Sequence, residues 1–152
     1  MEFRAESYLV LEMMLRGART LEDIADMLGI DVRRAAALVG ELASESLVER
    51  RRRRFPAGKE VYVLTEGGRA ALSRWREEVL RNVEKAAELR RQGREEEARA
   101  LLRPVIHILP ALLMFGVLDL ALFDAAVGKL EPEVEAAQSE ATADELPDET
   151  NP

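Results

Sequence analysis

The segment LVERRRRRFPAGKEVYVLT, residues 47–65, is the most informative part of the chain about its fold. Two runs typical of strands, Leu47-Val48 and residues 61–64, flank a turn signal at Pro56-Ala57-Gly58. β-branched and aromatic residues favour strands, and proline beside glycine favours the turn between them. The segment therefore predicts a β-hairpin that carries five consecutive arginines, Arg50 to Arg54, along its first strand and tip.

Three amphipathic helices are predicted before the hairpin, over residues 7–16, 20–29 and 32–44. Thr20 and Asp31 are the expected N-caps of the second and third helices, and Gly17 and Gly29 are the expected ends of the first and second. Apolar residues at three- and four-residue spacing form the inner faces: Tyr8, Leu11, Met14 and Leu15, then Leu21, Ile24, Ala25 and Leu28, then Ala35, Leu38, Val39 and Leu42. Helices two and three with a tight turn at Ile30 make a helix-turn-helix followed by a wing.

At this point the chain resembles the winged-helix repressors of the PadR and MarR type. Residues 56–69, PAGKEVYVLTEGGR, are similar to the family pattern that ends in Tyr-x-Leu-Thr-x-x-Gly-Arg. Leu42 with Leu47-Val48 is a second match, and the resemblance covers roughly residues 8–75. The chain departs from these families at Ser46, where they usually have glycine, and around Met13-Met14, which lack the His-Gly-Tyr signature of PadR proteins.

The resemblance implies that the third helix enters the major groove of double-stranded DNA while the wing contacts the backbone. Arg33, Arg34 and Ala37 then remain as outward residues near the start of that helix. Arginine can bind guanine with two hydrogen bonds, and alanine can contact the methyl group of thymine. The alternative is that both arginines only solubilise an exposed helix. Glu41 and Glu45 are expected to lie away from DNA.

The basic residues of the wing are the predicted phosphate contacts. They are Arg50, Arg51, Arg52, Arg53, Arg54 and Lys59. Side chains alternate between the two faces of a strand, so one face carries Arg50, Arg52 and Arg54 and the other carries Arg51 and Arg53. About half of these arginines can therefore contact phosphate at the same time. The other half could pair with acidic groups of the protein itself, and a run of arginines is also often only a solvated surface.

Composition limits the function further. The net charge is −7, but residues 1–103 hold 21 basic against 19 acidic residues, +2, and residues 104–152 hold 1 against 10, −9. No cysteine is present, and His107 is the only histidine, expected to be buried or interfacial rather than a ligand. No enzyme activity, cofactor or metal site is expected, and a charged, polar N-terminus without a signal peptide indicates a cytoplasmic location.

The residues after the wing are predicted to hold two copies of the chain together as a homodimer. Thr65 is the expected cap of a helix reaching about Gln92, which Gly93 ends before a short charged helix over residues 94–102. Leu72, Trp75 and Val79 belong to a heptad-like seam that continues through Asn82, Ala86 and Leu89. The alternative is that this seam packs on the protein's own helices.

Residues 104–127, PVIHILPALLMFGVLDLALFDAAV, are apolar on nearly every face, so a helix here must be buried. Burial in a dimer is expected for Leu112, Phe115, Leu122 and Phe123, with Pro110 kinking or restarting the helix. A membrane anchor is the less favoured alternative, because the apolar stretch from Val105 to Leu118 is shorter than the roughly 20 residues needed to cross a bilayer.

The sequence thus predicts a mainly α-helical protein with a small β-hairpin, in three parts. Residues 1–66 form a winged helix-turn-helix that binds DNA, residues 67–128 form dimerisation helices, and residues 129–152 form an acidic disordered tail that could compete with DNA for the wing. The predicted function is transcriptional regulation as a DNA-binding homodimer, as a repressor. The alternatives are a protein-interaction module whose wing binds an acidic protein partner, and a membrane-tethered regulator.

Overall fold

The computed structural model describes residues 2–52 and 60–128. The predicted turn at residues 56–58 and the acidic segment 129–152 lie outside these residues. The chain divides after Val79 into two compact units. Its elements are mainly helical with one two-stranded sheet, which confirms the predicted fold class.

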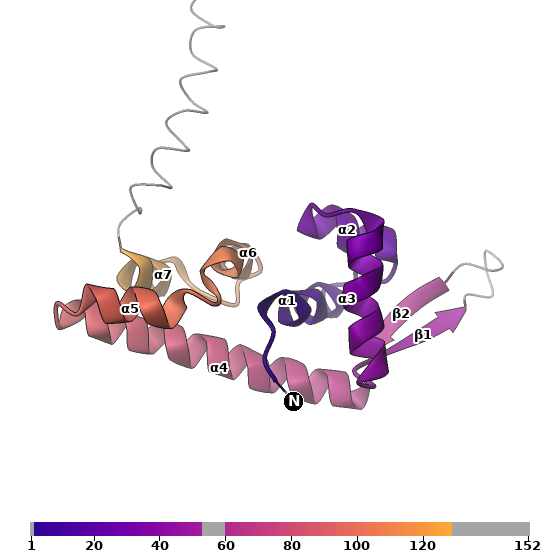
Figure 1. Cartoon of the computed structure of the whole chain (residues 1–152), viewed down its shortest axis with the longest axis horizontal. Coiled ribbons are helices and arrows are strands. Elements are labelled where there is room, and N and C mark those ends of the chain that lie inside the picture. The colour runs from indigo at the N-terminus through magenta and orange to yellow at the C-terminus, as the bar shows by residue number, and fades with distance from the viewer. Residues whose placement is uncertain (1, 53–59, 129–152) are drawn as a thin grey trace, which may run out of the picture. The chain divides into compact units, whose positions relative to one another are not determined.

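The first unit begins with three helices: α1 Ala5–Leu15, α2 Leu21–Leu28 and α3 Val32–Ser44 (Figure 1). Thr20 and Asp31 cap α2 and α3 as predicted, each accepting a hydrogen bond from the backbone N–H three residues later. Gly29 ends α2 with a φ of +69°, a left-handed conformation that glycine adopts without steric cost. These local signals place α2 and α3 as a helix-turn-helix.

The inner faces of the helices form the core of this unit. Tyr8, Leu11, Ile24, Ala35 and Leu42 are each 3% exposed or less. One predicted core residue was wrong, since Leu15 at the end of α1 is 48% exposed. Leu15 is the last residue of α1, and the chain changes direction at Gly17. The helical spacing therefore no longer determines whether its side chain faces the core or the solvent.

The predicted wing is confirmed as an antiparallel pair of β1 Val48–Arg52 and β2 Glu60–Leu64. Val48 lies opposite Leu64, and Arg52 lies opposite Glu60. The segment before α2 is bonded to this sheet, because the backbone N–H of Tyr62 donates to the carbonyl of Arg19 at 2.7 Å. The wing is thereby attached to the start of the helix-turn-helix.

The junction between α3, the wing and the next helix is tightly packed. Ser46 adopts a φ of +64°, the only positive φ outside glycine among the described residues, in a region where glycine meets no steric cost. Thr65 caps α4, Glu66–Arg91, by accepting from the N–H of Gly68, and its hydroxyl donates to the carbonyl of Ser46. A Cβ on Gly68 would lie 2.0 Å from the carbonyl oxygen of Leu47, so only glycine permits this approach.

The second unit contains the end of α4, α5 Glu95–Leu102, the 3₁₀ helix η1 Ile106–Ile108, α6 Leu109–Met114 and α7 Leu120–Val127. Gly93, with a φ of +77°, separates α4 from α5 as predicted. The core of the unit holds Val83, Ala86, Ala98, Ile108 and Leu118.

The prediction of one apolar helix over residues 104–127 was wrong, because the segment is broken into three short elements. Pro110 lies in the first turn of α6, where its missing N–H costs nothing, so the predicted restart at this residue is confirmed. Gly116 turns the chain with a φ of +77°, and Asp119 then caps α7 by accepting from the N–H of Leu122 at 2.7 Å. His107 is exposed rather than buried, since it lies on the outer side of η1.

Candidate nucleic-acid interface

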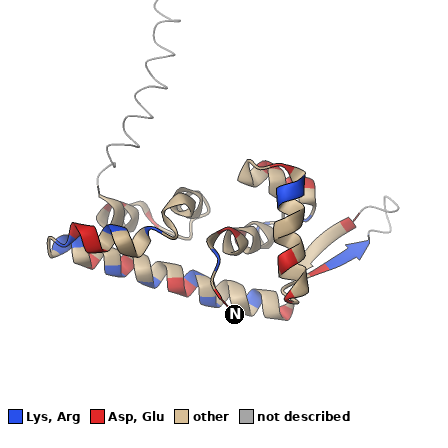
Figure 2. Cartoon of the chain, in the orientation of Figure 1, with Lys and Arg blue, Asp and Glu red and all other residues tan. Residues whose placement is uncertain are grey.

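The start of α3 presents the side chains predicted to read bases. Ala35, Leu38, Val39 and Leu42 bury the inner face of α3, so Arg33, Arg34 and Ala37 are left exposed. Figure 2 shows a basic band near the beginning of this helix. An exposed, basic first turn on the second helix of a helix-turn-helix is the arrangement that fits a major groove.

The two arginines differ in their partners. The guanidinium of Arg34 donates to the carboxylate of Glu6 at 2.8 Å, and both side chains are about half exposed, 52% and 43%. Such a surface ion pair contributes little stability and can be exchanged for a phosphate or a base. Arg33 has no ion-pair partner among the described residues. Arg33 is thus the freer of the two for contact with DNA.

The far half of α3 is acidic, and its carboxylates are engaged by the N-terminal segment. Arg4 forms ion pairs with Glu45 and, at 3.7 Å, with Glu41. Because one arginine meets two carboxylates, Glu41 and Glu45 are neutralised only in part. The basic end of α3 is therefore its first turn alone.

The wing carries exposed arginines along β1. Figure 2 shows this strand as mostly basic. Arg50 lies 3.9 Å from the carboxylate of Glu60, and Arg51 lies 3.4 Å from that of Glu49. Arg50 and Arg51 lie on opposite faces of the strand, as the predicted alternation requires, but an arginine on each face meets a carboxylate, whereas only one set was expected to do so. Arg52 is exposed, whereas Arg53, Arg54 and Lys59 lie outside the described residues.

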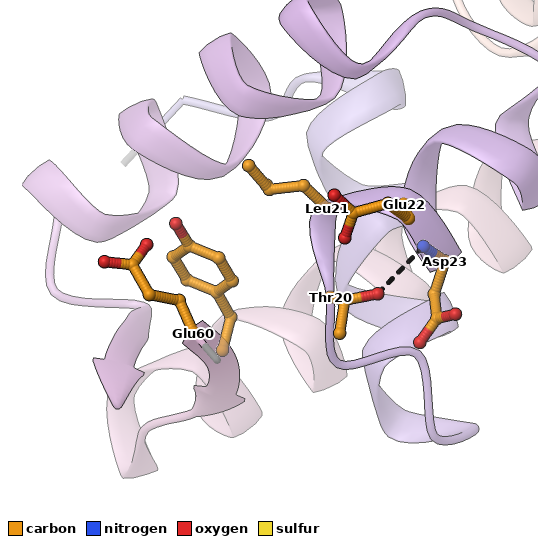
Figure 3. Close-up of a pocket in the computed structure, with 6 residues that line it drawn as sticks. Thr20, Leu21, Glu22, Asp23 and Glu60 are labelled. Carbon is orange, nitrogen blue, oxygen red and sulfur yellow. Dashed lines mark hydrogen bonds between the residues drawn. The ribbon is translucent and has the colours of Figure 1, made fainter. Parts of the chain in front are cut away.

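An acidic pocket lies between the start of α2 and the second wing strand (Figure 3). It has a volume of about 440 Å³, and Glu22, Asp23 and Glu60 line it together with Tyr62. The sequence alone did not single out these three carboxylates. Because carboxylates repel phosphate, a nucleic-acid backbone would be disfavoured at this pocket.

A buried ionic cluster, which was not predicted from the sequence, joins α1 to α4. Glu12 is fully buried, and it accepts hydrogen bonds from Tyr8, from Arg16 at 2.7 Å and from Arg76 at 2.6 and 2.8 Å. Its position inside the apolar run LVLEMML was the one available signal, since a charge there needs a partner.

The cluster fixes the ionisation of its members. Burial by itself would raise the pKa of Glu12, but the hydrogen bonds from Arg76, Tyr8 and Arg16 outweigh it, so that pKa is lowered. Burial, followed by the hydrogen bond to Glu12, raises the pKa of Tyr8. The hydrogen bond to Glu12 raises the pKa of Arg76. Glu12 is therefore a carboxylate, and α1 and α4 are joined by a charged pair with a phenol beside it.

The residues predicted to dimerise fall into two groups. Leu72, Trp75, Val79 and Leu112 are between 0% and 4% exposed, so their own chain already covers them and a partner could contact little of them. Phe115, Leu122 and Phe123 are partly exposed. The most exposed large apolar residues of the second unit were not predicted: Met114 at 85% and Leu120 at 60%.

The described residues, 2–52 and 60–128, contain neither a membrane-spanning helix nor a metal-binding cluster. Within these ranges no helix is long and apolar enough to span a bilayer. No group of three or more histidine, aspartate or glutamate residues in the same ranges is arranged to hold a metal ion.

The helix-turn-helix and the hairpin that follows it define a winged-helix fold. No family model matches the chain, and no curated protein matches it. Among solved structures, the chain is similar to the oxidised form of MarR from E. coli. The TM-score is 0.44 with 17% sequence identity, over 96% of this chain and 77% of that chain. At this level of likeness the comparison assigns neither a family nor a function, and the fold rests on the elements described above.

Proposed function

We propose that this protein is a sequence-selective DNA-binding transcription regulator that represses by occluding a promoter. One observation carries the proposal: α3 of a capped helix-turn-helix exposes Arg33 and Ala37 on its first two turns, directly before a wing strand of exposed arginines. Arg33 and Arg34 would contact base edges, and Ala37 a thymine methyl group. The wing arginines, Arg50 to Arg54 with Lys59, would contact phosphate on the flanking backbone.

A titration against DNA tests the proposal. Fluorescence polarisation would compare the promoter DNA upstream of the protein's own gene with a random duplex of equal length, over a series of salt concentrations. Selective binding should appear as a preference for the upstream duplex of about a thousandfold or more. Replacing Arg50 and Arg52 with alanine should weaken binding to both duplexes and reduce the salt slope by roughly 0.9 for each phosphate that is no longer bound.

Arg74→Ala is the matched control for this titration. Arg74 is exposed on α4 and takes part in none of the proposed DNA contacts, so its replacement should leave affinity and slope unchanged. Equal binding of both duplexes by the unaltered protein would contradict selective recognition.

We also propose that the protein acts as a homodimer through its second unit. Met114, Leu120 and Ile106 expose 85%, 60% and 40% of their surface there, and Phe115, Leu122 and Phe123 add partly exposed rings and methyl groups. Exposed apolar side chains gathered in one short segment are typical of an association surface. A two-fold dimer would place its two copies of α3 on half-sites about one helical turn of DNA apart.

A second candidate function has its own observation. The carboxylates of Glu22, Asp23 and Glu60 line a pocket beside the wing, where phosphate would be repelled. That arrangement favours a winged helix that binds another protein, with the wing arginines on acidic side chains and the carboxylates on basic ones. Absence of measurable binding to any duplex at low salt would favour this candidate.

A further inference from the structure

A basic pocket lies at the base of the wing, and Arg51 is the one described residue that it shares with the surface proposed to bind DNA. Its volume is about 340 Å³. Three arginines from distant parts of the sequence line it: Arg19 before α2, Arg51 on β1 and Arg69 in the first turns of α4. Met14, Leu15 and Val63 supply apolar surface, and no carboxylate lines it. The pocket thus combines three positive charges with an apolar wall.

These charges are poorly neutralised by the protein. Among the described residues, Arg19 and Arg69 form no ion pair with any carboxylate. Arg51 has one, with Glu49 at 3.4 Å, in which both side chains are more than half exposed, so a stronger anion can displace it. Three guanidinium groups that line one concave surface repel one another, and an anion bound among them would offset that repulsion. The arrangement therefore favours binding of a compact, multiply charged anion.

The register of the wing distinguishes this pocket from the DNA-binding surface. Residues directly opposite one another in a hairpin share a face, so Arg50, Arg52 and the partner of Arg52, Glu60, lie on one face. Arg51, opposite Val61, lies on the other face. The pocket contains Arg51 but neither Arg50 nor Arg52. Tyr62 and Leu64, from the face of Arg50, also line the pocket, so what distinguishes it from the phosphate-binding surface is that Arg51 is the one described wing arginine in its lining.

We propose that this pocket binds a small organic anion with two or more negative charges, either a phosphate ester or a di- or tricarboxylate. The three guanidinium groups would donate paired hydrogen bonds to its oxygens, a geometry that suits both chemistries. Its carbon skeleton would lie against Met14, Leu15 and Val63. Because the residues come from α1, the wing and α4, the bound anion would connect the wing to both helices.

Isothermal titration calorimetry on the full chain tests this without DNA, so the result is independent of the proposed function. Citrate and inorganic pyrophosphate would be titrated separately at constant ionic strength, which distinguishes a carboxylate site from a phosphate site. We expect one equivalent per chain for at least one probe, with a Kd of about 1 mM or tighter. Arg19→Gln and Arg69→Gln should each weaken that binding about tenfold, since each removes charge-assisted hydrogen bonds. Arg19→Gln keeps the backbone carbonyl that accepts from Tyr62.

Arg74→Gln is the matched control, because Arg74 is exposed on α4 but outside the pocket. It should leave both titrations within about twofold of the unaltered protein, as expected for a surface charge with no direct contact. No saturable binding of either probe, or an equal loss in Arg74→Gln, would overturn the proposal. A reduced salt slope for duplex DNA in Arg69→Gln would also overturn it, by assigning the pocket to the DNA backbone.

Discussion

Arg76 on α4 donates two hydrogen bonds to the buried carboxylate of Glu12 on α1, from Nε at 2.8 Å and from Nη2 at 2.6 Å. The two residues are 64 positions apart in the sequence. Next to them, the ring of Phe3 packs against both Tyr8 and Trp75, with ring centroids 6.0 and 5.9 Å apart. A charged pair and an aromatic group thus attach the first half of α4 to α1, which fixes this part of α4 within the first unit.

Loss of one partner of this pair should be costly. Arg76→Leu leaves Glu12 ionised and buried with fewer donors, and we expect a loss of about 2–3 kcal/mol in the free energy of unfolding. The double variant Glu12→Leu, Arg76→Leu should lose less than the sum of the two single variants, because it leaves no unpaired charge. Urea denaturation of all three variants measures this, and additive losses would mean that the pair is not coupled.

The same pair predicts a dependence on pH. The folded state lowers the pKa of Glu12, so this carboxylate contributes stability above its unfolded pKa of about 4.3. That contribution is lost as the pH falls through the lower, folded pKa. The difference in unfolding free energy between the protein and Glu12→Gln should therefore be constant from about pH 5 to 7 and shrink below about pH 4. A difference independent of pH down to about pH 3 would contradict the assigned ionisation.

Base reading by α3 should depend more on Arg33 than on Arg34, because Arg34 is partly neutralised by Glu6. Arg33→Ala should cost on the order of 1–3 kcal/mol on a selected DNA site and much less on random DNA. Glu6→Ala is the matched control variant, because it removes the ion-pair partner of Arg34 without changing α3. The affinity of this variant for DNA should be equal to that of the unaltered protein or higher. Polarisation titrations on both duplexes give the comparison, and equal losses on the two would assign Arg33 to phosphate.

We expect that Gly68 at the wing exit cannot be replaced by alanine without a loss of stability, whereas its neighbour Gly67 can. A Cβ at Gly68 would meet the carbonyl oxygen of Leu47 at 2.0 Å, while one at Gly67 meets nothing closer than 3.6 Å. Gly68→Ala should therefore destabilise by about 1–3 kcal/mol or more as the backbone shifts. Gly67→Ala should be neutral or stabilise by up to about 1 kcal/mol, because alanine favours helix. Thermal unfolding followed by circular dichroism separates the two, and similar melting temperatures would show that the junction yields easily.

Association should depend on the exposed apolar residues of the second unit. We expect the protein to be dimeric in solution, and Met114→Glu with Leu120→Glu should shift it to monomer and reduce DNA affinity, because two charges would enter the interface. Met27→Glu is the matched control, since Met27 is 46% exposed on α2 of the first unit. Size-exclusion chromatography with light scattering gives the mass. A monomeric unaltered protein at micromolar concentration would exclude the proposed dimer.

Elements with local signals could be predicted from the amino-acid sequence. Thr20, Asp31 and Thr65 each accept a backbone hydrogen bond from three residues ahead, and Gly29 and Gly93 adopt left-handed conformations that end helices. The hairpin follows from the two strand runs, whereas its register is known from the structure alone. Helix caps, turns and the spacing of apolar residues each depend on residues a few positions apart. They could therefore be predicted without the structure.

Contacts between residues far apart in the chain could be learned from the three-dimensional structure alone. It paired Glu12 with Arg76, gathered Arg19, Arg51 and Arg69 around one pocket, and covered Leu112 while exposing Met114 two residues later. Residues 104–127 are apolar on nearly every face. The spacing of apolar residues in this segment therefore could not distinguish buried positions from exposed ones. Long-range contacts depend on the direction in which each helix leaves its turn, and that direction is set by packing rather than by any local pattern.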